Sequence, residues 1–192
     1  MRFILLAVVI IMAGSRFSRL FKKDNVPETT VEDVLAKKSE NEALAADKKA
    51  SFLATTEAIE SNSGENTEHK TMTDGMHAGQ RAVGRFGLMP KTISEMVKRM
   101  KSDDSAPSAL NAIGSSQLNE QEVADLVAAD QDLERAVADK MYSHVNKRMA
   151  GDEEKMDYGW LNGHNLNPDS ITPDKLMNPR TEKFRKLREK LK

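Results

Sequence analysis

The stretch that decides the fold is residues 119–149, NEQEVADLVAADQDLERAVADKMYSHVNKRM. Its apolar residues recur every three or four positions, the spacing of one helix face: Val123, Leu126, Val127, Leu133, Val137, Met141 and Val145. The pattern breaks near Asp130, so we predict two successive helices. Because no strand-like alternation of useful length occurs elsewhere, the sequence predicts a mainly α protein.

Two segments before this block also favour helices. Residues 49–60 and residues 92–101 both show helical spacing, and the first ends where residues 61–64, Ser-Asn-Ser-Gly, stop the pattern. The chain between them is interrupted by glycine and proline, at Gly75, Gly79, Gly84, Gly87 and Pro90. We therefore expect an irregular connection there rather than a long regular element.

The N-terminus carries an unbroken apolar run, residues 3–14. Such a run spans about 18 Å as a helix, short of the roughly 30 Å hydrocarbon core of a bilayer. The length is typical of a signal peptide, and Ala-Gly-Ser at 13–15 resembles a cleavage site. Four basic residues follow at once and disfavour translocation, so an uncleaved membrane anchor over residues 1–23 is the alternative.

Composition excludes several kinds of protein. The 192 residues include no cysteine, which rules out disulfides, thiolate metal sites and cysteine nucleophiles. Residues 24–179 hold 17 basic and 28 acidic residues, a charge of −11 that argues against nucleic-acid binding. The four histidines lack paired ligand spacing, so we expect no metal and no other cofactor.

These observations divide the chain into four parts. We expect a signal peptide or anchor over 1–23, a polar stalk or linker helix over 24–48, and a folded domain over 49–166. Residues 167–192 are a strip rich in proline and asparagine followed by a basic helix. That helix places Phe184, Leu187 and Leu191 on one face among basic residues, which suits an acidic protein surface or anionic lipid; a solvated tail is the alternative.

Three short motifs carry the candidate chemistry: Ala-Ile-Glu-Ser at 58–61, Ala-Val-Gly-Arg-Phe-Gly-Leu-Met-Pro-Lys-Thr at 82–92, and Tyr-Gly-Trp-Leu-Asn-Gly at 158–163. In this order and spacing they resemble the lysozyme-like lytic transglycosylases of the soluble-transglycosylase type, which cleave the glycan strands of peptidoglycan. Glu60-Ser61 matches the catalytic pair that ends a helix in that family. The resemblance covers about residues 50–166 and implies a lysozyme-like fold.

The second and third motifs match in part. Gly84, Leu88, Met89, Pro90 and Thr92 agree with the family pattern, whereas the three residues at 85–87 depart from it. A glutamine is usual where Gly87 stands. In the third motif Trp160 takes the aromatic position and Gly163 the glycine, but Leu161 stands where asparagine is usual and Asn162 follows one place later.

The resemblance implies that Glu60 is the only catalytic carboxyl. It would protonate the leaving oxygen between N-acetylmuramic acid and N-acetylglucosamine and then deprotonate the substrate's 6-hydroxyl, which gives 1,6-anhydromuramyl ends. From the residues alone, a general acid needs a carboxyl desolvated by apolar neighbours, and Ala58 and Ile59 flank Glu60. The expected substrate-binding residues are Ser61, Gly87, Leu88, Met89, Tyr158, Trp160 and Asn162.

Some of these residues also fit purely structural roles. The sequence is also compatible with two other functions. Ser61 also suits a helix-end turn, and Trp160 also suits a core. A hydrolytic muramidase would need a second carboxyl to hold water, from Glu65, Glu68 or Asp74. A membrane-anchored structural protein with a degenerate lysozyme-like fold is the non-enzymatic alternative.

The substrate implies where the protein acts. Peptidoglycan lies in the periplasm or cell wall, so we expect a protein that is exported or anchored in the inner membrane through its N-terminal segment. A component of a phage virion is the alternative. Small enzymes of this kind often serve a larger secretion, conjugation or phage assembly, and the basic C-terminal helix is the segment expected to dock there.

Overall fold

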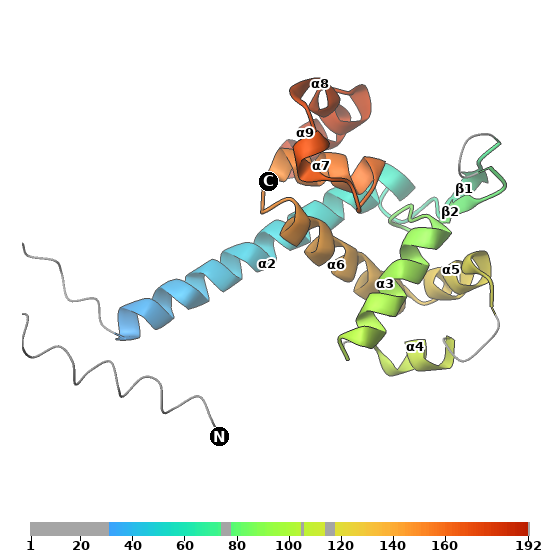
Figure 1. The fold of residues 1–192 in the computed structure, drawn as a ribbon, viewed down its shortest axis with the longest axis horizontal. Coiled ribbons are helices and arrows are strands. Elements are labelled where there is room, and N and C mark those ends of the chain that lie inside the picture. Colours follow the sequence, from blue (N-terminus) through green and yellow to red (C-terminus); the bar gives the residue numbers. More distant parts are fainter. Residues whose placement is uncertain (1–30, 74–77, 105, 114–117, 192) are drawn as a thin grey trace, which may run out of the picture. The chain divides into compact units, whose positions relative to one another are not determined.

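The computed structural model describes residues 31–73, 78–104, 106–113 and 118–191 (Figure 1). This part of the chain is mainly helical, as predicted. Its elements are, in order, α2 (Val31–Ser61), β1 (Glu68–Thr71), β2 (Arg81–Val83), α3 (Pro90–Ser102), α4 (Ser108–Ile113), α5 (Glu120–Ala129), α6 (Gln131–Arg148), α7 (Glu153–Asn162), the 3-10 turn η3 (Pro168–Ser170), α8 (Pro173–Leu176) and α9 (Pro179–Leu191).

The predicted signal peptide or anchor at residues 1–23 lies outside the described residues. No helix in the described part of the chain combines the length and the apolar character needed to cross a membrane.

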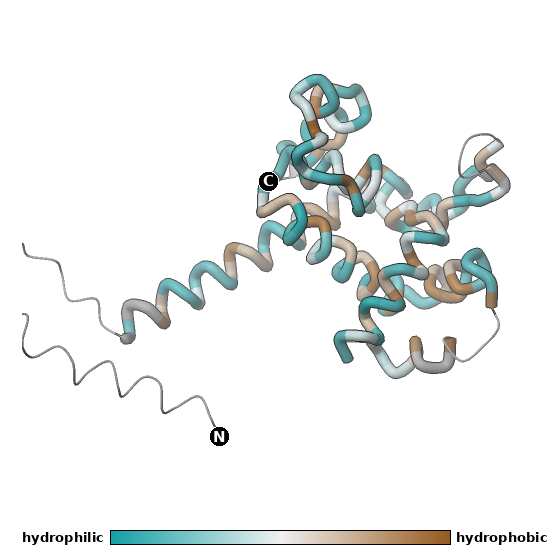
Figure 2. Tube along the Cα trace, viewed as in Figure 1, coloured by the Kyte–Doolittle hydropathy of each residue, from teal (hydrophilic) through white to brown (hydrophobic). Residues whose placement is uncertain are grey.

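Helix α2 passes from an exposed segment into the core. It runs for 31 residues, and the chain divides into two compact units between Glu42 and Ala43. The side chains of residues 35–48 are exposed, and Figure 2 shows that most of them are hydrophilic. Burial begins at Phe52 and Leu53. The change from polar stalk to folded domain predicted at residue 49 therefore falls inside one continuous helix.

The predicted break near Asp130 is confirmed. Asp130 ends α5 and is the N-cap of α6, where its side chain accepts hydrogen bonds from the backbone N–H groups of Asp132 and Leu133. Asn119 caps α5 in the same way and forms a capping box with Glu122. Short polar side chains thus fix where both helices start.

The core of the unit Ala43–Lys192 is built on an aromatic cluster around Phe52. The Phe52 ring lies 5.2 Å from the rings of Tyr142 and Trp160 and 5.3 Å from that of Phe184. These partners belong to α6, α7 and α9, so one side chain joins four helices. Edge-on and tilted packing of this kind adds to the gain from burial.

A short hairpin is the main departure from the predicted fold. Strands β1 and β2 pair antiparallel, and an isolated bridge between Val83 and Leu88 extends the pairing past the turn at 84–87. The strands hold four and three residues, too few for a two-residue alternation to be seen in the sequence.

The basic C-terminal helix is part of the compact unit. Phe184 and Thr181 on α9 are fully buried, and the buried Arg188 guanidinium contacts Asp157 on α7. The solvated-tail alternative is therefore wrong for this helix. The compact unit extends past the boundary that the sequence suggested at residue 166.

Asp157 makes the stability of the unit depend on pH. Its buried Oδ1 accepts a hydrogen bond from Arg188 Nη1 at 2.6 Å, yet burial raises the pKa of the carboxyl to about 7. The unfolded carboxyl ionises near its ordinary pKa of 3.8, so between these values the folded state holds a proton that the unfolded state has lost. This group therefore lowers stability as pH rises from about 4 to about 7.

We expect Asp157→Asn to flatten the fall in the free energy of unfolding over this pH range, by up to about 4 kcal/mol. Asparagine keeps an oxygen that accepts from Arg188 and has no proton to lose. Urea unfolding of both proteins at several pH values between 4 and 7 measures the difference. Equal slopes in the two proteins would contradict the assignment.

Candidate functional site

Glu60 lies in the last turn of α2, at the edge of the core. Its side chain is 16% exposed, and Oε1 accepts a hydrogen bond from Nη2 of Arg180 at 2.9 Å. Ile59 beside it packs against the core. The carboxyl is thus mostly covered but borders solvent.

The turn at residues 84–87 packs against this carboxyl. Gly84 and Gly87 both have positive φ, +70° and +57°, a conformation that favours glycine. A Cβ atom on Gly87 would lie 2.7 Å from Glu60 Oε2, closer than real Cβ atoms come. Together with the positive φ, this close approach favours glycine at position 87.

Glu134 on α6 holds the other end of the turn, and sequence reasoning missed it. Its side chain is buried, and Oε1 accepts hydrogen bonds from the backbone N–H groups of Arg85 at 2.5 Å and Phe86 at 3.2 Å. A Cβ atom on Gly84 would overlap that carboxylate. Burial raises the pKa of Glu134, although both backbone hydrogen bonds oppose the rise. The sequence did contain one signal: Glu134 shares the helical spacing of the apolar residues Ala138 and Met141, so it lies on the same helix face as they do.

Arg85 and Ser61 both contact Glu57 on α2. Arg85 Nε lies 2.9 Å from Glu57 Oε1, one turn before Glu60 on α2. The buried Ser61 hydroxyl donates to the Glu57 carbonyl and accepts from the N–H of Gly64, both at 2.9 Å. Ser61 therefore fills the helix-end role that the sequence left as an alternative.

Leu88 and Met89, the other expected binding residues of the second motif, follow the turn directly. Leu88 is buried in the core, and its backbone exchanges hydrogen bonds with Val83 at 3.0 and 3.2 Å. Met89 is half-buried and directly precedes α3, which starts at Pro90.

The third motif lies on α7 and reaches Glu60 through Arg180. The Leu161 carbonyl accepts from Arg180 Nη1 at 3.4 Å, while the other terminal nitrogen of the same guanidinium contacts Glu60. Trp160 is buried edge-on against Phe52, the core role left open by the sequence.

The other two predicted residues of this motif lie nearer the surface. Tyr158 is half-buried against the core, and the side chain of the exposed Asn162 donates to the Tyr158 carbonyl at 3.0 Å. Their placement leaves part of the Tyr158 ring and the Asn162 amide accessible to solvent.

The loop after α7 is fastened by polar contacts that the sequence did not indicate. Glu95 Oε2 on α3 lies 2.8 Å from His164 Nε2 and accepts from the Asn165 side chain at 2.9 Å. The hydrogen bond to His164 is the main cause that lowers the pKa of Glu95. These contacts hold the loop that follows the third motif in sequence against α3.

The carboxyls considered for a hydrolytic water lie on the segment after Glu60. Glu65 Oε2 accepts from the Asn62 side chain at 2.5 Å, and Glu68 is exposed on β1. Asp74 lies outside the described residues.

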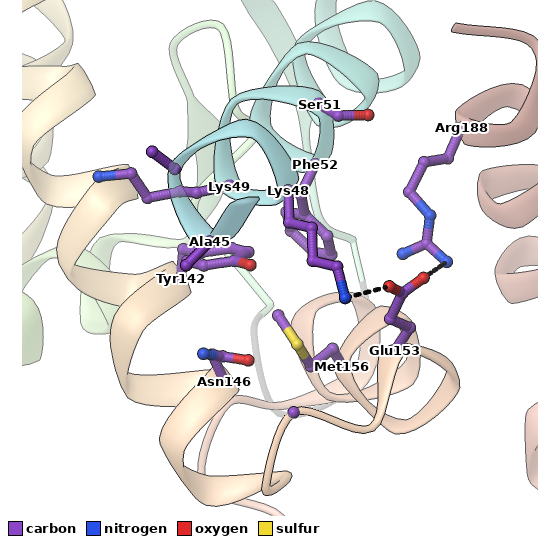
Figure 3. Close-up of a pocket in the computed structure, with 12 residues that line it drawn as sticks. Ala45, Lys48, Lys49, Ser51, Phe52, Tyr142, Asn146, Glu153, Met156 and Arg188 are labelled. Carbon is purple, nitrogen blue, oxygen red and sulfur yellow. Dashed lines mark ion pairs between the residues drawn. The ribbon is translucent and has the colours of Figure 1, made fainter. Parts of the chain in front are cut away.

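A cavity of about 470 Å³ lies elsewhere, between α2, α6, α7 and α9 (Figure 3). Phe52, Tyr142 and Met156 contribute apolar walls. Glu153 forms ion pairs with Lys48 at 3.5 Å and with Arg188 at 3.3 Å. Glu60 is not among the residues that line it.

Comparisons of the chain with protein-family models, with curated proteins and with solved structures found no match.

Gly87→Ala tests the packing of the turn on Glu60, and Gly79→Ala is its matched control. Both glycines have positive φ, but a Cβ on Gly79 meets nothing within 4 Å. We expect Gly79→Ala to cost about 1 kcal/mol of stability from backbone strain and Gly87→Ala about 2–4 kcal/mol, because the clash with Glu60 is added. Denaturant unfolding measures both, and equal costs would refute the contact.

Glu134→Ala and Glu134→Gln test the anchor of the turn. Alanine leaves the N–H groups of Arg85 and Phe86 without their acceptor, so we expect a loss of about 2–4 kcal/mol. Glutamine keeps an acceptor oxygen and should cost at least about 1 kcal/mol less. Thermal and urea unfolding give the comparison. If both variants lose the same stability, the carboxylate does not act through these hydrogen bonds.

Proposed function

We propose that this protein is a peptidoglycan lytic transglycosylase with a lysozyme-like domain, which cleaves the β-1,4 bond between N-acetylmuramic acid and N-acetylglucosamine. The observation that carries the proposal is the meeting of three distant motifs at one carboxyl. Glu60 belongs to the first motif, Gly87 of the second packs on its Oε2 side, and Arg180 joins its Oε1 to Leu161 of the third.

This arrangement supports Glu60 as the general acid and base. The carboxyl is mostly enclosed, and its side chain keeps 16% of its surface exposed to solvent. It would first protonate the leaving oxygen and then take the proton of the substrate's 6-hydroxyl as that oxygen attacks the anomeric carbon. The attack closes a 1,6-anhydro ring and releases the glycan without adding water.

The placement of Glu134 favours a mechanism with one carboxyl over hydrolysis with two. Its Oε1 is engaged by two backbone N–H groups of the turn, and that turn separates it from Glu60. A hydrolytic muramidase remains the second candidate function, with Glu65 or Glu68 as the group that would hold water.

The proposed substrate also sets the proposed location. We place the protein in the periplasm or at the cell wall, exported or anchored through residues 1–23, or alternatively in a phage virion. On α9 the lysines at 183, 186 and 190 remain exposed. These cations are the proposed contact with a larger secretion, conjugation or phage assembly.

Digestion of purified peptidoglycan by the wild-type protein and by Glu60→Gln tests the function. We expect the wild type to release fragments with 1,6-anhydromuramyl ends, identified by mass spectrometry. We expect Glu60→Gln to lose activity by at least about a hundredfold, because an amide transfers no proton.

Glu65→Gln is the matched control, since it removes a carboxyl from the loop that follows Glu60. It should cleave like the wild type. Reducing ends in place of anhydro ends would establish hydrolysis, and loss of that activity in Glu65→Gln would identify the second carboxyl. No release by any of the proteins would support a structural role.

A further inference from the structure

We propose that the cavity between α2, α6, α7 and α9 is a binding site for a small organic anion with an apolar body, the chemistry of a medium-chain fatty acid. Its volume of about 470 Å³ lies within the usual range for small-molecule sites, which often form between the helices of a bundle. The cavity is separate from Glu60, which is not among its lining residues. The inference therefore stands or falls independently of the proposed glycan cleavage.

The inner walls of the cavity are apolar and are held in place by the core. The Phe52 ring packs edge-on against the Tyr142 ring at 5.2 Å, and Met156 is buried in the same core. A methionine side chain adapts its shape to an irregular apolar partner. Ala45 and Ala46 are exposed at the edge of α2, so the cavity opens to solvent there. A ligand that enters at this edge can place an apolar body against the inner walls.

The hydroxyl of Tyr142 lacks a hydrogen-bond partner at this cavity. The residue is only 9% exposed, and none of the residues that the structure describes pairs with its hydroxyl. Buried polar groups are normally paired, and an unpaired one costs stability. Burial raises the pKa of Tyr142, so the hydroxyl keeps its proton at neutral pH and can donate a hydrogen bond. An acceptor atom of a bound ligand would satisfy it.

Two further donors line the same space. Asn146 is half-buried one turn after Tyr142 on α6 and offers its amide nitrogen, and Lys48 on α2 offers its ammonium group. Figure 3 shows the Tyr142 oxygen, the Asn146 amide and the Lys48 nitrogen around one space. A carboxylate only accepts hydrogen bonds and can take several at once, so it matches three donors better than a hydroxyl or an amine does.

The charges on the lining also favour an anion. Among the described residues, cations outnumber carboxylates there: Lys48, Lys49 and Arg188 against Glu153. Glu153 is shared by two of these cations, Lys48 and Arg188. Asp139 and Asp157, which also pair with lining cations, are not among the lining residues themselves. Positive charge therefore faces the cavity, where apolar walls weaken the screening of its attraction for a ligand carboxylate.

Isothermal titration calorimetry of the full chain with octanoate, kept below its critical micelle concentration, tests the site. Octanol and octyltrimethylammonium are the matched controls, because they carry the same apolar chain with no charge and with a positive charge. We expect the Kd of octanoate to be lower than that of either control by at least about tenfold, since only octanoate pairs with the donors and cations. Equal affinities for the three compounds would overturn the proposal, and so would no binding of octanoate.

Tyr142→Phe and Lys48→Gln test where the carboxylate binds. Phenylalanine keeps the ring that packs on Phe52 and removes only the hydroxyl, and glutamine removes the cation. Each change should raise the Kd of octanoate by about fivefold and leave that of octanol unchanged. Lys37→Gln removes an exposed cation from α2 outside the cavity and should bind octanoate like the wild type. Wild-type affinity for octanoate in both cavity variants would overturn the proposal.

NMR of the protein labelled with [¹³C-methyl]methionine places the ligand. Met156 lines the cavity, whereas Met177 is 67% exposed at the end of α8 and is the internal control. We expect octanoate to shift the Met156 methyl signal, assigned by its loss in Met156→Leu, and to leave that of Met177 in place. A shift of both signals or of neither would overturn the proposal. The Met156 shift should persist in Glu60→Gln, so failure of the glycan-cleaving function would leave this site intact.

Discussion

The turn at residues 84–87 exists in its observed form because two carboxylates face it from opposite ends. Glu134 on α6 accepts its N–H groups at one end, and Glu60 on α2 lies against Gly87 at the other. Each contact needs a glycine, since a Cβ at 84 or 87 would overlap a carboxylate. The turn therefore links α2 and α6 through these two side chains.

This constraint accounts for two residues of the second motif. The side chain of Arg85 pairs with Glu57, and its N–H donates a hydrogen bond to Glu134. Gly87 lets the turn pack against Glu60. An ion pair and backbone hydrogen bonds thus hold the turn next to the Glu60 carboxyl.

The sequence predicts what depends on local physics and misses what depends on contacts between distant residues. The α5–α6 break follows from Asp130, whose side chain bonds to residues two and three positions later. The location of Glu60 at a helix end follows from the stop signal after it. Glu134 and Arg180 escape prediction because their partners lie 48 to 120 residues away in the chain. Trp160 and Ser61 suited two roles each, and only the packing shows which contacts they make.

The structure changes the interpretation of the basic residues of α9. From the sequence alone, these cations suggest a surface for an external partner, but in the structure they lie on different faces of the helix. Arg188 enters the core to meet Asp157, Arg180 meets Glu60, and the lysines stay exposed. Two of the basic residues of α9 thus contact carboxyl groups that are largely enclosed. The buried Arg188–Asp157 contact joins α9 to α7, and Arg180 joins the start of α9 to the end of α2. The C-terminal helix is therefore a structural part of the domain and not an appendage to it.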